Sequence, residues 1–274
     1  MTLKLTLETK ADNAILPINY QYPLSAAIYK IFKKGDEAYA RFLHDIGYKQ
    51  NSSLKAFRFF CFSDIRTPFR IFHDRLHLLT RQAELRICFH LPKAVEYFIK
   101  GLFRSQVIEI ADHKSRVSFI VVSVESIPSM PSSLDFDKHG VQELLLIPQS
   151  PIVCGLKDSR GNYDFLAPGH PYFKTMLFNN WKSKYEVAYG IHDLEDTFKT
   201  AAIELLPSVK SPRSRLITIK DGTPQATKIK GYMDFRLKVT GKKLALDLLL
   251  NSGVGLYNSQ GMGYVLATFI DSEN

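Results

Sequence analysis

The side chains best suited to chemistry are a histidine, a tyrosine and a lysine in the first quarter of the chain. His44 stands in the last helical turn before Gly47, where the helix dipole favours an imidazolium. Histidine takes up and releases a proton near neutral pH, and it is therefore the usual acid–base catalyst. Tyr29 lies at the edge of an apolar helical stripe, and Lys55 follows the polar loop 50–53. We expect the three to converge on one site, although most single histidines serve only on surfaces or in packing.

A second candidate site is a glycine-rich stretch near the C-terminus. Two Gly-x-Gly units stand within eleven residues, at Gly253, Gly255, Gly261 and Gly263. Glycine adopts φ > 0 without penalty, and its bare N–H groups can form an anion-binding nest. The stretch follows an expected helix and precedes an expected strand, which is the reverse of the dinucleotide-binding order. We therefore expect it to lie against a phosphate backbone, through N–H groups and the uncharged Tyr257, Asn258 and Ser259.

Most of the net charge of +9 lies in one segment. Residues 207–243 hold ten basic residues and two acidic ones, a net charge of +8. Residues 228–239 alternate, which predicts a strand with an apolar face and a cationic face that also carries Tyr232. Such a face suits nucleic-acid phosphates, whereas an edge strand that uses lysines against aggregation is the alternative. The residues predicted to bind RNA or DNA here are Lys210, Arg213, Arg215, Lys228, Lys230, Arg236 and Lys238.

Composition excludes several other classes of protein. An apolar content of 45% suits a folded core, and no apolar run approaches the length of a membrane span. Cys61, Cys88 and Cys154 have no metal-ligand spacing and suit packing roles in a reducing cytoplasm. No Walker loop or Gly-x-Ser-x-Gly elbow occurs, and carboxylates are not grouped as a two-metal nuclease requires. We expect a cytoplasmic protein with no signal peptide, metal or cofactor.

The order of expected elements predicts an α+β fold. In the first part these are strand 2–9, a helical pair 22–46 interrupted at Gly35, strand 55–64, hairpin 68–80, strand 83–90, helix 92–103, and strands 106–111 and 115–126. This is the ferredoxin-like order with an added hairpin. In the second part they are strands 141–157 and 162–166, helix 171–187, strand 202–206, hairpin 213–220/225–239, helix 242–251 and a terminal strand. The Pro/Ser-rich residues 127–133 predict a linker between domains 1–127 and 134–274.

The helical pair 22–46 carries an apolar stripe in each half. Its spacing predicts burial of Leu24, Ala27, Ile28, Ile31 and Phe32 in the first half, and of Tyr39, Phe42, Leu43 and Ile46 in the second. His44 falls off the second stripe, on the flank that it shares with Glu37, Ala40 and Arg41.

The chain resembles the CRISPR-associated endoribonucleases of the RAMP superfamily that cut precursor CRISPR RNA, the Cas-six family. The resemblance spans the whole length and is carried by the glycine stretch, the Tyr29/His44/Lys55 set, Ser150-Pro-Ile-Val153 and the helix end Glu186-Val-Ala-Tyr-Gly190. It implies two ferredoxin-like (RRM-like) domains in tandem, with an RNA-binding cleft between them and the glycine-rich loop at the C-terminal end. It also implies a metal-independent cut of CRISPR repeat RNA that leaves a 2′,3′-cyclic phosphate and a 5′-hydroxyl.

The same resemblance implies roles for the three residues. His44 and Tyr29 become the acid–base pair, with the division of roles open, and Lys55 becomes the stabilising cation, with Lys49 as its alternative. The chain departs from the family in the centre of the glycine stretch, which has no basic residue. Two other functions remain open, a non-catalytic RNA-binding RAMP subunit and a small-molecule nucleotide binder. A homodimer and transfer of the product to a CRISPR effector complex are also left open.

Overall fold

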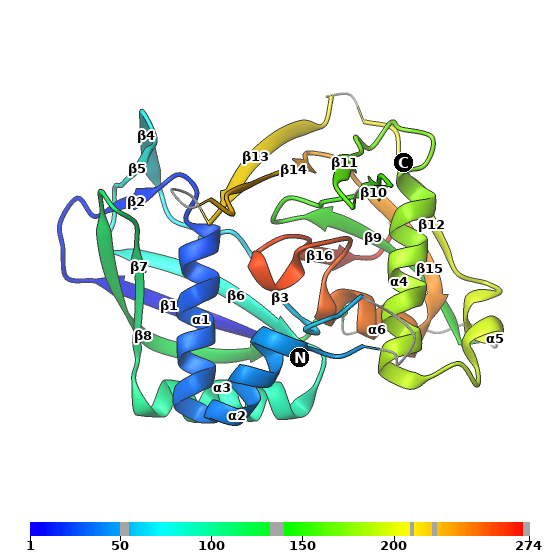
Figure 1. Cartoon of the computed structure of the whole chain (residues 1–274), viewed down its shortest axis with the longest axis horizontal. Helices are drawn as coiled ribbons and strands as arrows, with labels where there is room; N and C mark the ends of the chain where they lie inside the picture. The colour runs from blue at the N-terminus through cyan, green and yellow to red at the C-terminus, as the bar shows by residue number, and fades with distance from the viewer. Residues whose placement is uncertain (50–54, 132–139, 160, 209–210, 221–223, 271–274) are drawn as a thin grey trace.

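Two antiparallel sheets lie side by side along the long axis of the molecule (Figure 1). The computed structural model describes residues 1–49, 55–131, 140–159, 161–208, 211–220 and 224–270. Lys210, one of the predicted RNA-binding residues, lies outside the described residues. No helix in the described part of the chain combines the length and the apolarity needed to cross a membrane.

The first sheet has five strands in the order β3 (Phe60–Phe62), β6 (Gln82–Phe89), β1 (Thr2–Thr9), β8 (Arg116–Ile127) and β7 (Val107–Ala111). Leu3, Leu5 and Leu7 alternate on β1 and are buried, as their spacing predicts. Helices α1 (Gln21–Gly35) and α3 (Pro92–Arg104) pack against each other and contribute to the same hydrophobic core as these leucines. Without the added edge strand β7, this is the ferredoxin-like order.

The second sheet has four strands in the order β12 (Ala202–Leu205), β15 (Leu237–Lys242), β9 (Val141–Pro148) and β16 (Val265–Thr268). Strands and helices follow one another along the chain in the same order as in the first unit. Helices α4 (Phe173–Tyr189) and α6 (Lys243–Ser252) take the places that α1 and α3 have there. Trp181 of α4 is fully buried and donates a hydrogen bond to the carbonyl oxygen of Ala245 at 2.8 Å. The repeated topology confirms the α+β fold with two ferredoxin-like units.

Each unit also carries insertions. Strands β4 (Phe69–Phe72) and β5 (Arg75–Leu78) form a hairpin that pairs with β2 (Ile15–Pro17), a strand not predicted from the sequence. Strands β13 (Arg213–Ile219) and β14 (Thr227–Met233) form a separate ribbon, as do β10 (Gly155–Lys157) and β11 (Tyr163–Phe165). Two short helices, α2 (Glu37–Arg41) and α5 (Leu194–Phe198), complete the set with η1 (Phe42–Ile46) and η2 (Asn258–Gln260).

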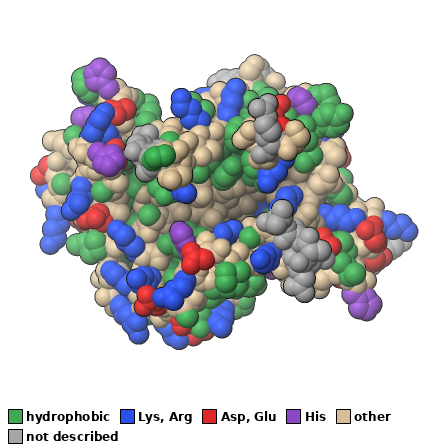
Figure 2. Space-filling view, viewed as in Figure 1, with side chains coloured by type: hydrophobic (Ala, Val, Ile, Leu, Met, Phe, Trp, Pro, Cys, Tyr) green, Lys and Arg blue, Asp and Glu red, His purple; other side chains and the backbone are tan. Residues whose placement is uncertain are grey.

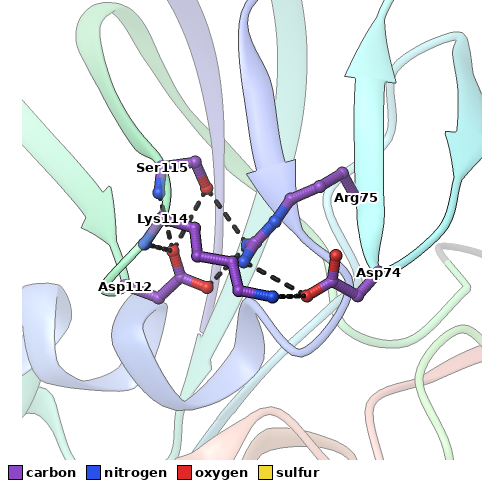
Figure 3. Close-up of polar contacts among 5 residues, drawn as sticks. All are labelled: Asp74, Arg75, Asp112, Lys114 and Ser115. Atoms are coloured by element: carbon purple, nitrogen blue, oxygen red, sulfur yellow. Dashed lines mark hydrogen bonds and ion pairs between the residues drawn. The ribbon is translucent and has the colours of Figure 1, made fainter.

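The β4–β5 hairpin is held to the β7–β8 turn by a cluster of charged groups (Figure 3). Arg75 donates to Asp112 at 2.5 Å and also forms an ion pair with Asp74 at 3.3 Å. Lys114 donates to Asp74 at 3.0 Å, and Asp112 accepts the backbone N–H of Ser115 at 2.8 Å. The Arg75 side chain is only 12% exposed, so its ion pairs are largely buried and hold the hairpin against the sheet.

Three predicted strands differ from those observed. The predicted strand 55–64 shortens to β3, because Phe59 has a left-handed backbone with φ 52° that interrupts it. Strand 141–157 breaks after Pro148, where the N–H groups of Gln149 and Ser150 both donate to the carbonyl oxygen of Tyr264. The arm 225–239 splits at Asp234, whose φ is 63°, so β14 and β15 belong to different sheets.

Candidate active site

A cleft of about 800 Å³ is lined by residues of α1, of α4 and of the glycine-rich loop. In the ribbon view this loop lies between the two helices (Figure 1). The space-filling view shows the hollow in the middle of this face, with Lys and Arg side chains around it (Figure 2). Tyr29, His44 and Lys55 all line the cleft, together with residues 255–260. The structure brings Tyr29 and His44 together and places Lys55 in the lining of the same cleft, whereas their chemical roles stay predictions.

Tyr29 and His44 are in direct ring contact. Their ring centroids are 5.6 Å apart and the ring planes are 87° apart, an edge-to-face arrangement. Tyr29 also packs edge to face on Phe60 of β3, at 5.8 Å, so its ring is held from two sides. Burial raises the pKa of the Tyr29 phenol, and hydrogen bonding with Ser259 and the charge of Arg58 oppose that rise. The phenol therefore stays protonated at neutral pH.

His44 stands on a π-helical turn, η1, that closes α2. The N–H of Gly47 donates to the carbonyl oxygen of Phe42 at 2.7 Å, an i to i+5 bond that widens the turn. Such turns occur frequently at functional sites. In this wider turn each residue rotates about the helix axis by a smaller angle than in an α-helix. Ile46 therefore no longer lies on the apolar stripe, and it is 51% exposed. The predicted burial of Ile46 is therefore wrong, whereas that of Tyr39 and Leu43 is confirmed.

Two charged neighbours not predicted from the sequence orient His44. Its Nδ1 lies 2.7 Å from Oδ1 of Asp45, and a hydrogen bond from Nδ1–H to this carboxylate leaves the lone pair on Nε2. Arg58 donates from Nε to the carbonyl oxygen of Leu43 and from Nη2 to that of His44, both at 3.0 Å. Its guanidinium thus satisfies the carbonyls at the end of the helix. The sequence feature that could have indicated this role is the charge of Arg58 inside the otherwise apolar run 56–62.

Two lysines were predicted as alternatives for the cation of the site, and they lie in different places. Lys55 lines the cleft, whereas Lys49 is exposed and does not line it. Burial lowers the pKa of the Lys55 ammonium, and the nearby ammonium of Lys157 adds to this effect. Of the two candidate lysines, Lys55 is therefore the one whose side chain reaches the cleft, and its role stays a prediction.

Lys184 is a buried lysine in the wall of the cleft that sequence reasoning missed. Its side chain is 2% exposed, and its ammonium donates to the carbonyl oxygens of Ser252 and Gly253 and to Oδ1 of Asn258, the last at 2.7 Å. Burial lowers the pKa of Lys184 to about 7. The sequence did contain a sign of this burial, because Lys184 has the helical spacing of the apolar stripe formed by Leu177 and Trp181 on α4.

The four glycines of the loop are required by packing within the chain. All are buried and have φ between 75° and 88°. A Cβ on Gly263 would lie 2.0 Å from the carbonyl oxygen of Val254, and one on Gly255 would lie 2.3 Å from that of Val153. The N–H groups of Gly261 and Gly263 already donate to the carbonyl oxygens of Asn258 and Pro151. The expected exposed N–H groups at Gly261 and Gly263 are therefore not available to an anion.

The centre of the loop presents side chains to the cleft instead. Tyr257 is half-buried and meets the ring of Tyr163 edge to face, with centroids 6.2 Å apart. Ser259 lies beside Tyr29, and its carbonyl oxygen accepts a hydrogen bond from the hydroxyl of Ser25 at 2.7 Å. Asn258 uses its amide inside the loop, where Nδ2 donates to the carbonyl oxygens of Val254 and Met262. The loop therefore offers Tyr257 and Ser259 to a ligand, whereas Asn258 holds the loop together.

The predicted cationic strand divides into parts with different surroundings. Lys228 and Lys230 are exposed on β14, as predicted for a cationic face, but Tyr232 on the same strand is buried. Arg213 is exposed on β13 and donates to Asp234 at 3.0 Å. Arg236 is exposed beyond the split at Asp234 and therefore outside the ribbon.

Two further residues of the predicted RNA-binding set, Arg215 and Lys238, also have structural partners. Arg215 donates to Asp64 of the first unit at 2.6 Å and lies over the ring of Tyr20. Lys238 forms ion pairs with Glu143 and Glu204 in the second sheet. The prediction of one continuous cationic face was wrong, because residues 228–239 do not form a single strand.

The cations of the cleft come mainly from outside the 207–243 segment. Among the residues that the structure describes, eight basic and two acidic side chains line the cleft, and of these Lys220 is the one basic side chain from residues 207–243. The acidic ones are Glu37, which pairs with Lys33 and Arg41, and Asp45. The basic ones are Lys30, Lys33, Arg41, Lys55, Arg58, Lys157, Lys184 and Lys220. Such an excess of positive charge suits a polyanion.

Among the residues that the structure describes, no group of three or more His, Cys, Asp and Glu side chains could hold a metal ion. All three cysteines are buried free thiols, as their sequence context predicts.

Comparison with known proteins adds family information to this geometry. The family model described as CRISPR-associated protein Cas6, N-terminal, matches residues 15–125, and the model described as CRISPR associated protein Cas6, C-terminal, matches residues 136–266. A curated protein of Methanocaldococcus jannaschii, named CRISPR-associated endoribonuclease Cas6 1, is 28% identical over 195 residues, which cover 69% of this chain and 68% of that protein.

Solved structures show the same fold. One described as CRISPR associated protein Cas6 has a TM-score of 0.70 and 25% identity, and the match covers 98% of this chain and 99% of that chain. Another, described as a Cas6-related gene from Pyrococcus furiosus, has a TM-score of 0.76 and 20% identity, with coverage of 100% and 99%. The two family models together account for most of both ferredoxin-like units. The chain belongs to the Cas6 family of CRISPR-associated proteins.

Proposed function

We propose that this protein, an RNA-cleaving enzyme of the Cas6 family, cuts CRISPR repeat RNA in the precursor transcript to give mature guide RNAs. One observation carries the proposal, namely that an edge-to-face Tyr29–His44 pair and the ammonium of Lys55 line one strongly basic cleft. The name of the curated relative from Methanocaldococcus jannaschii supports the class of reaction. The two proposed domains, 1–127 and 134–274, each supply one wall of that cleft.

The proposed reaction is an attack of the ribose 2′-hydroxyl on the adjacent phosphorus. The 2′-oxygen loses its proton and forms a bond to phosphorus, while the bond from phosphorus to the 5′-oxygen breaks and that oxygen takes up a proton. The products are a 2′,3′-cyclic phosphate and a 5′-hydroxyl. This reaction needs a base, an acid and a cation near the phosphate, and it needs no metal ion.

The side chains of the cleft match these three requirements. His44 and Tyr29 share the acid and base roles, since a neutral imidazole accepts a proton at Nε2 and a protonated phenol can donate one. Asp45 supports the imidazolium that forms when His44 takes a proton, because their atoms are 2.7 Å apart. Lys55 stabilises the charge that develops on the phosphate oxygens.

The RNA is proposed to run along the cleft and onto the β13–β14 ribbon. Tyr257 offers a ring for stacking, and Lys228 and Lys230 offer exposed ammonium groups for phosphates. Lys30, Lys157 and Lys220 add further positive charge to the lining of the cleft.

A cleavage assay in EDTA tests the proposal. Purified protein is incubated with repeat RNA, with the same RNA carrying a 2′-deoxyribose at the cut position, and with variants Lys55→Ala and Lys49→Ala. We expect cutting in EDTA, a cyclic phosphate on the product, no cutting of the deoxy substrate, and a slower rate for Lys55→Ala only. A requirement for magnesium would contradict the mechanism. Binding without cutting would instead support the alternative, a non-catalytic RNA-binding RAMP subunit.

A further inference from the structure

A small side pocket of about 200 Å³ opens from the cleft next to Lys55. Its walls come from β10, β11, α4 and the start of the glycine-rich loop. The pocket and the cleft share six lining residues, which shows that the two spaces are continuous, namely Lys55, Lys157, Tyr163, Asn180, Gly255 and Leu256. A ligand that lies in the cleft can therefore extend one group into this pocket.

The interior of the pocket is apolar and has an aromatic wall. Val153 and Leu177 are buried and form part of its lining with Met176 and Leu256. The ring of Tyr163 stacks on Phe165 with planes 20° apart, which holds it in place at one side. A flat apolar group of limited size suits these surroundings, because aromatic and apolar side chains stack on planar rings.

One polar side chain reaches the pocket from α4. Asn180 is 4% exposed, and its Oδ1 is buried without a hydrogen-bond partner among the described residues. A buried acceptor that stays unpaired costs free energy, and such groups in folded proteins are nearly always satisfied. A ligand that donates one hydrogen bond inside the pocket would satisfy Oδ1.

The mouth of the pocket is cationic. Lys55 and Lys157 are close enough for their charges to interact, and Nζ of Lys157 lies 5.4 Å from the centre of the Tyr163 ring. Two ammonium groups outside a flat apolar slot correspond to the two parts of a nucleotide, a phosphate outside and a base inside. A purely apolar ligand would leave the charged mouth without a purpose.

We propose that this side pocket takes one unstacked nucleobase of the RNA, next to the phosphate at Lys55, and that Asn180 accepts a hydrogen bond from the amino group of that base. The inference rests on the proposed function and adds a determinant of substrate sequence to it. Asn180 is then a specificity residue and not part of the acid–base machinery. Single-stranded RNA is commonly read in this way, by stacking an unstacked base and hydrogen bonding to its edge.

An abasic scan tests the pocket by equilibrium binding and does not depend on cleavage. Repeat RNA with a 2′-deoxyribose at the cut position is prepared with one base removed at each position in turn. We expect one position beside the cut where loss of the base weakens binding by about 5- to 150-fold, the range for base stacking on aromatic side chains. Replacing that base by its analogue without the amino group should weaken binding less than removing it.

Three variants connect this position to the pocket. Asn180→Leu removes the acceptor and Met176→Trp fills the slot, whereas Asn179→Leu changes an exposed asparagine on the same helix and serves as the control. The effect of the amino group should disappear in Asn180→Leu, and the effect of the whole base should disappear in Met176→Trp. Both effects should persist in Asn179→Leu. Thermal unfolding shows whether each variant is folded, and Met176→Trp keeps the test decisive if Asn180→Leu is unstable.

The outcomes separate the two proposals. If no position is sensitive, or if Asn180→Leu and Met176→Trp leave both effects unchanged, the pocket is not a base site, and normal cutting of unmodified repeat RNA would then leave the cleavage proposal standing. If the deoxy-substituted RNA binds with the expected pattern and unmodified repeat RNA is not cut, the pocket proposal stands and the cleavage proposal fails. If the protein binds no RNA, both proposals fail.

Discussion

The ring of His44 meets the ring of Tyr29 edge to face, with centroids 5.6 Å apart, although the two residues belong to different helical segments. The contact exists because η1 turns back beside α1 and Arg58 holds the carbonyl oxygens at its end. It brings an imidazole and a protonated phenol to the same wall of a basic cleft. Four predictions follow from this arrangement and from the contacts that support it.

Replacing His44 by Ala should slow cleavage and leave RNA binding nearly unchanged. The loss of a general acid–base group costs about 10²–10⁴-fold in rate. The His44 side chain is 73% exposed, so its removal should not unfold the protein. Single-turnover cleavage and filter binding measure the two effects separately, with His73→Ala on the β4–β5 turn as the control. Equal losses of rate and affinity would argue for a binding role.

Replacing Lys184 by Met should remove a pH dependence of stability. The pKa of Lys184 is lowered by burial from 10.5 to about 7, so between these values the unfolded chain binds a proton that the folded chain does not. The contribution of Lys184 to the free energy of unfolding therefore rises with pH above 7, by on the order of 2 kcal/mol between pH 7 and 9. Below pH 7 both states are protonated and the cost of the buried charge is fully present.

Urea unfolding at several pH values checks this prediction. The free energy of unfolding of the wild type minus that of Lys184→Met should become more positive from pH 7 to pH 9. The same difference for Lys182→Met, on the same helix, should show little change with pH. A difference that is flat across this range would mean that Lys184 keeps its proton in the folded protein. Binding of RNA by Lys184→Met should also weaken, since the loop at Asn258 loses its ammonium partner.

Replacing Gly263 by Ala should disrupt the glycine-rich loop more than the same change at Gly190. Both glycines have positive φ, at 75° and 88°, which costs a side chain about 1–3 kcal/mol. At Gly263 the added Cβ would also lie 2.0 Å from a backbone oxygen, whereas at Gly190 nothing lies within 4 Å. Thermal and urea unfolding should show an additional loss of about 1–3 kcal/mol for Gly263→Ala. Equal losses would contradict the tight packing of the loop.

Replacing Arg215 by Met should loosen the contact between the two units. Its guanidinium lies 2.6 Å from Asp64, and both side chains are mostly buried, at 27% and 21% exposed. Leaving Asp64 without this partner should cost about 1–3 kcal/mol of unfolding free energy. Arg213→Met is the matched control on the same strand, since its pair with Asp234 is exposed and should contribute below about 1 kcal/mol. A similar effect of the two variants in urea unfolding would show that the Asp64 pair is not a clamp.

The architecture was readable from the sequence because each element carries its own local signal. Alternation at Leu3, Leu5 and Leu7 predicts a half-buried strand, and the 3.6-residue period of α1 predicts its buried face. Two predicted strands failed at a backbone conformation without a local signal. Phe59 and Asp234 adopt positive φ, and the strands predicted across them break there.

The same division applies to the site. The sequence alone indicated Tyr29 and His44 as candidates for acid–base chemistry and Lys55 as the candidate cation, since their types and surroundings are local properties; these roles stay predictions. Only the tertiary structure decided which charges surround them, because Lys157, Lys184 and Arg58 reach the cleft from segments far apart in the chain. It also decided that Arg215 and Lys238 pair with carboxylates of other elements. The partner of a charged side chain depends on which segments fold against each other, and a linear pattern of charges does not contain that information.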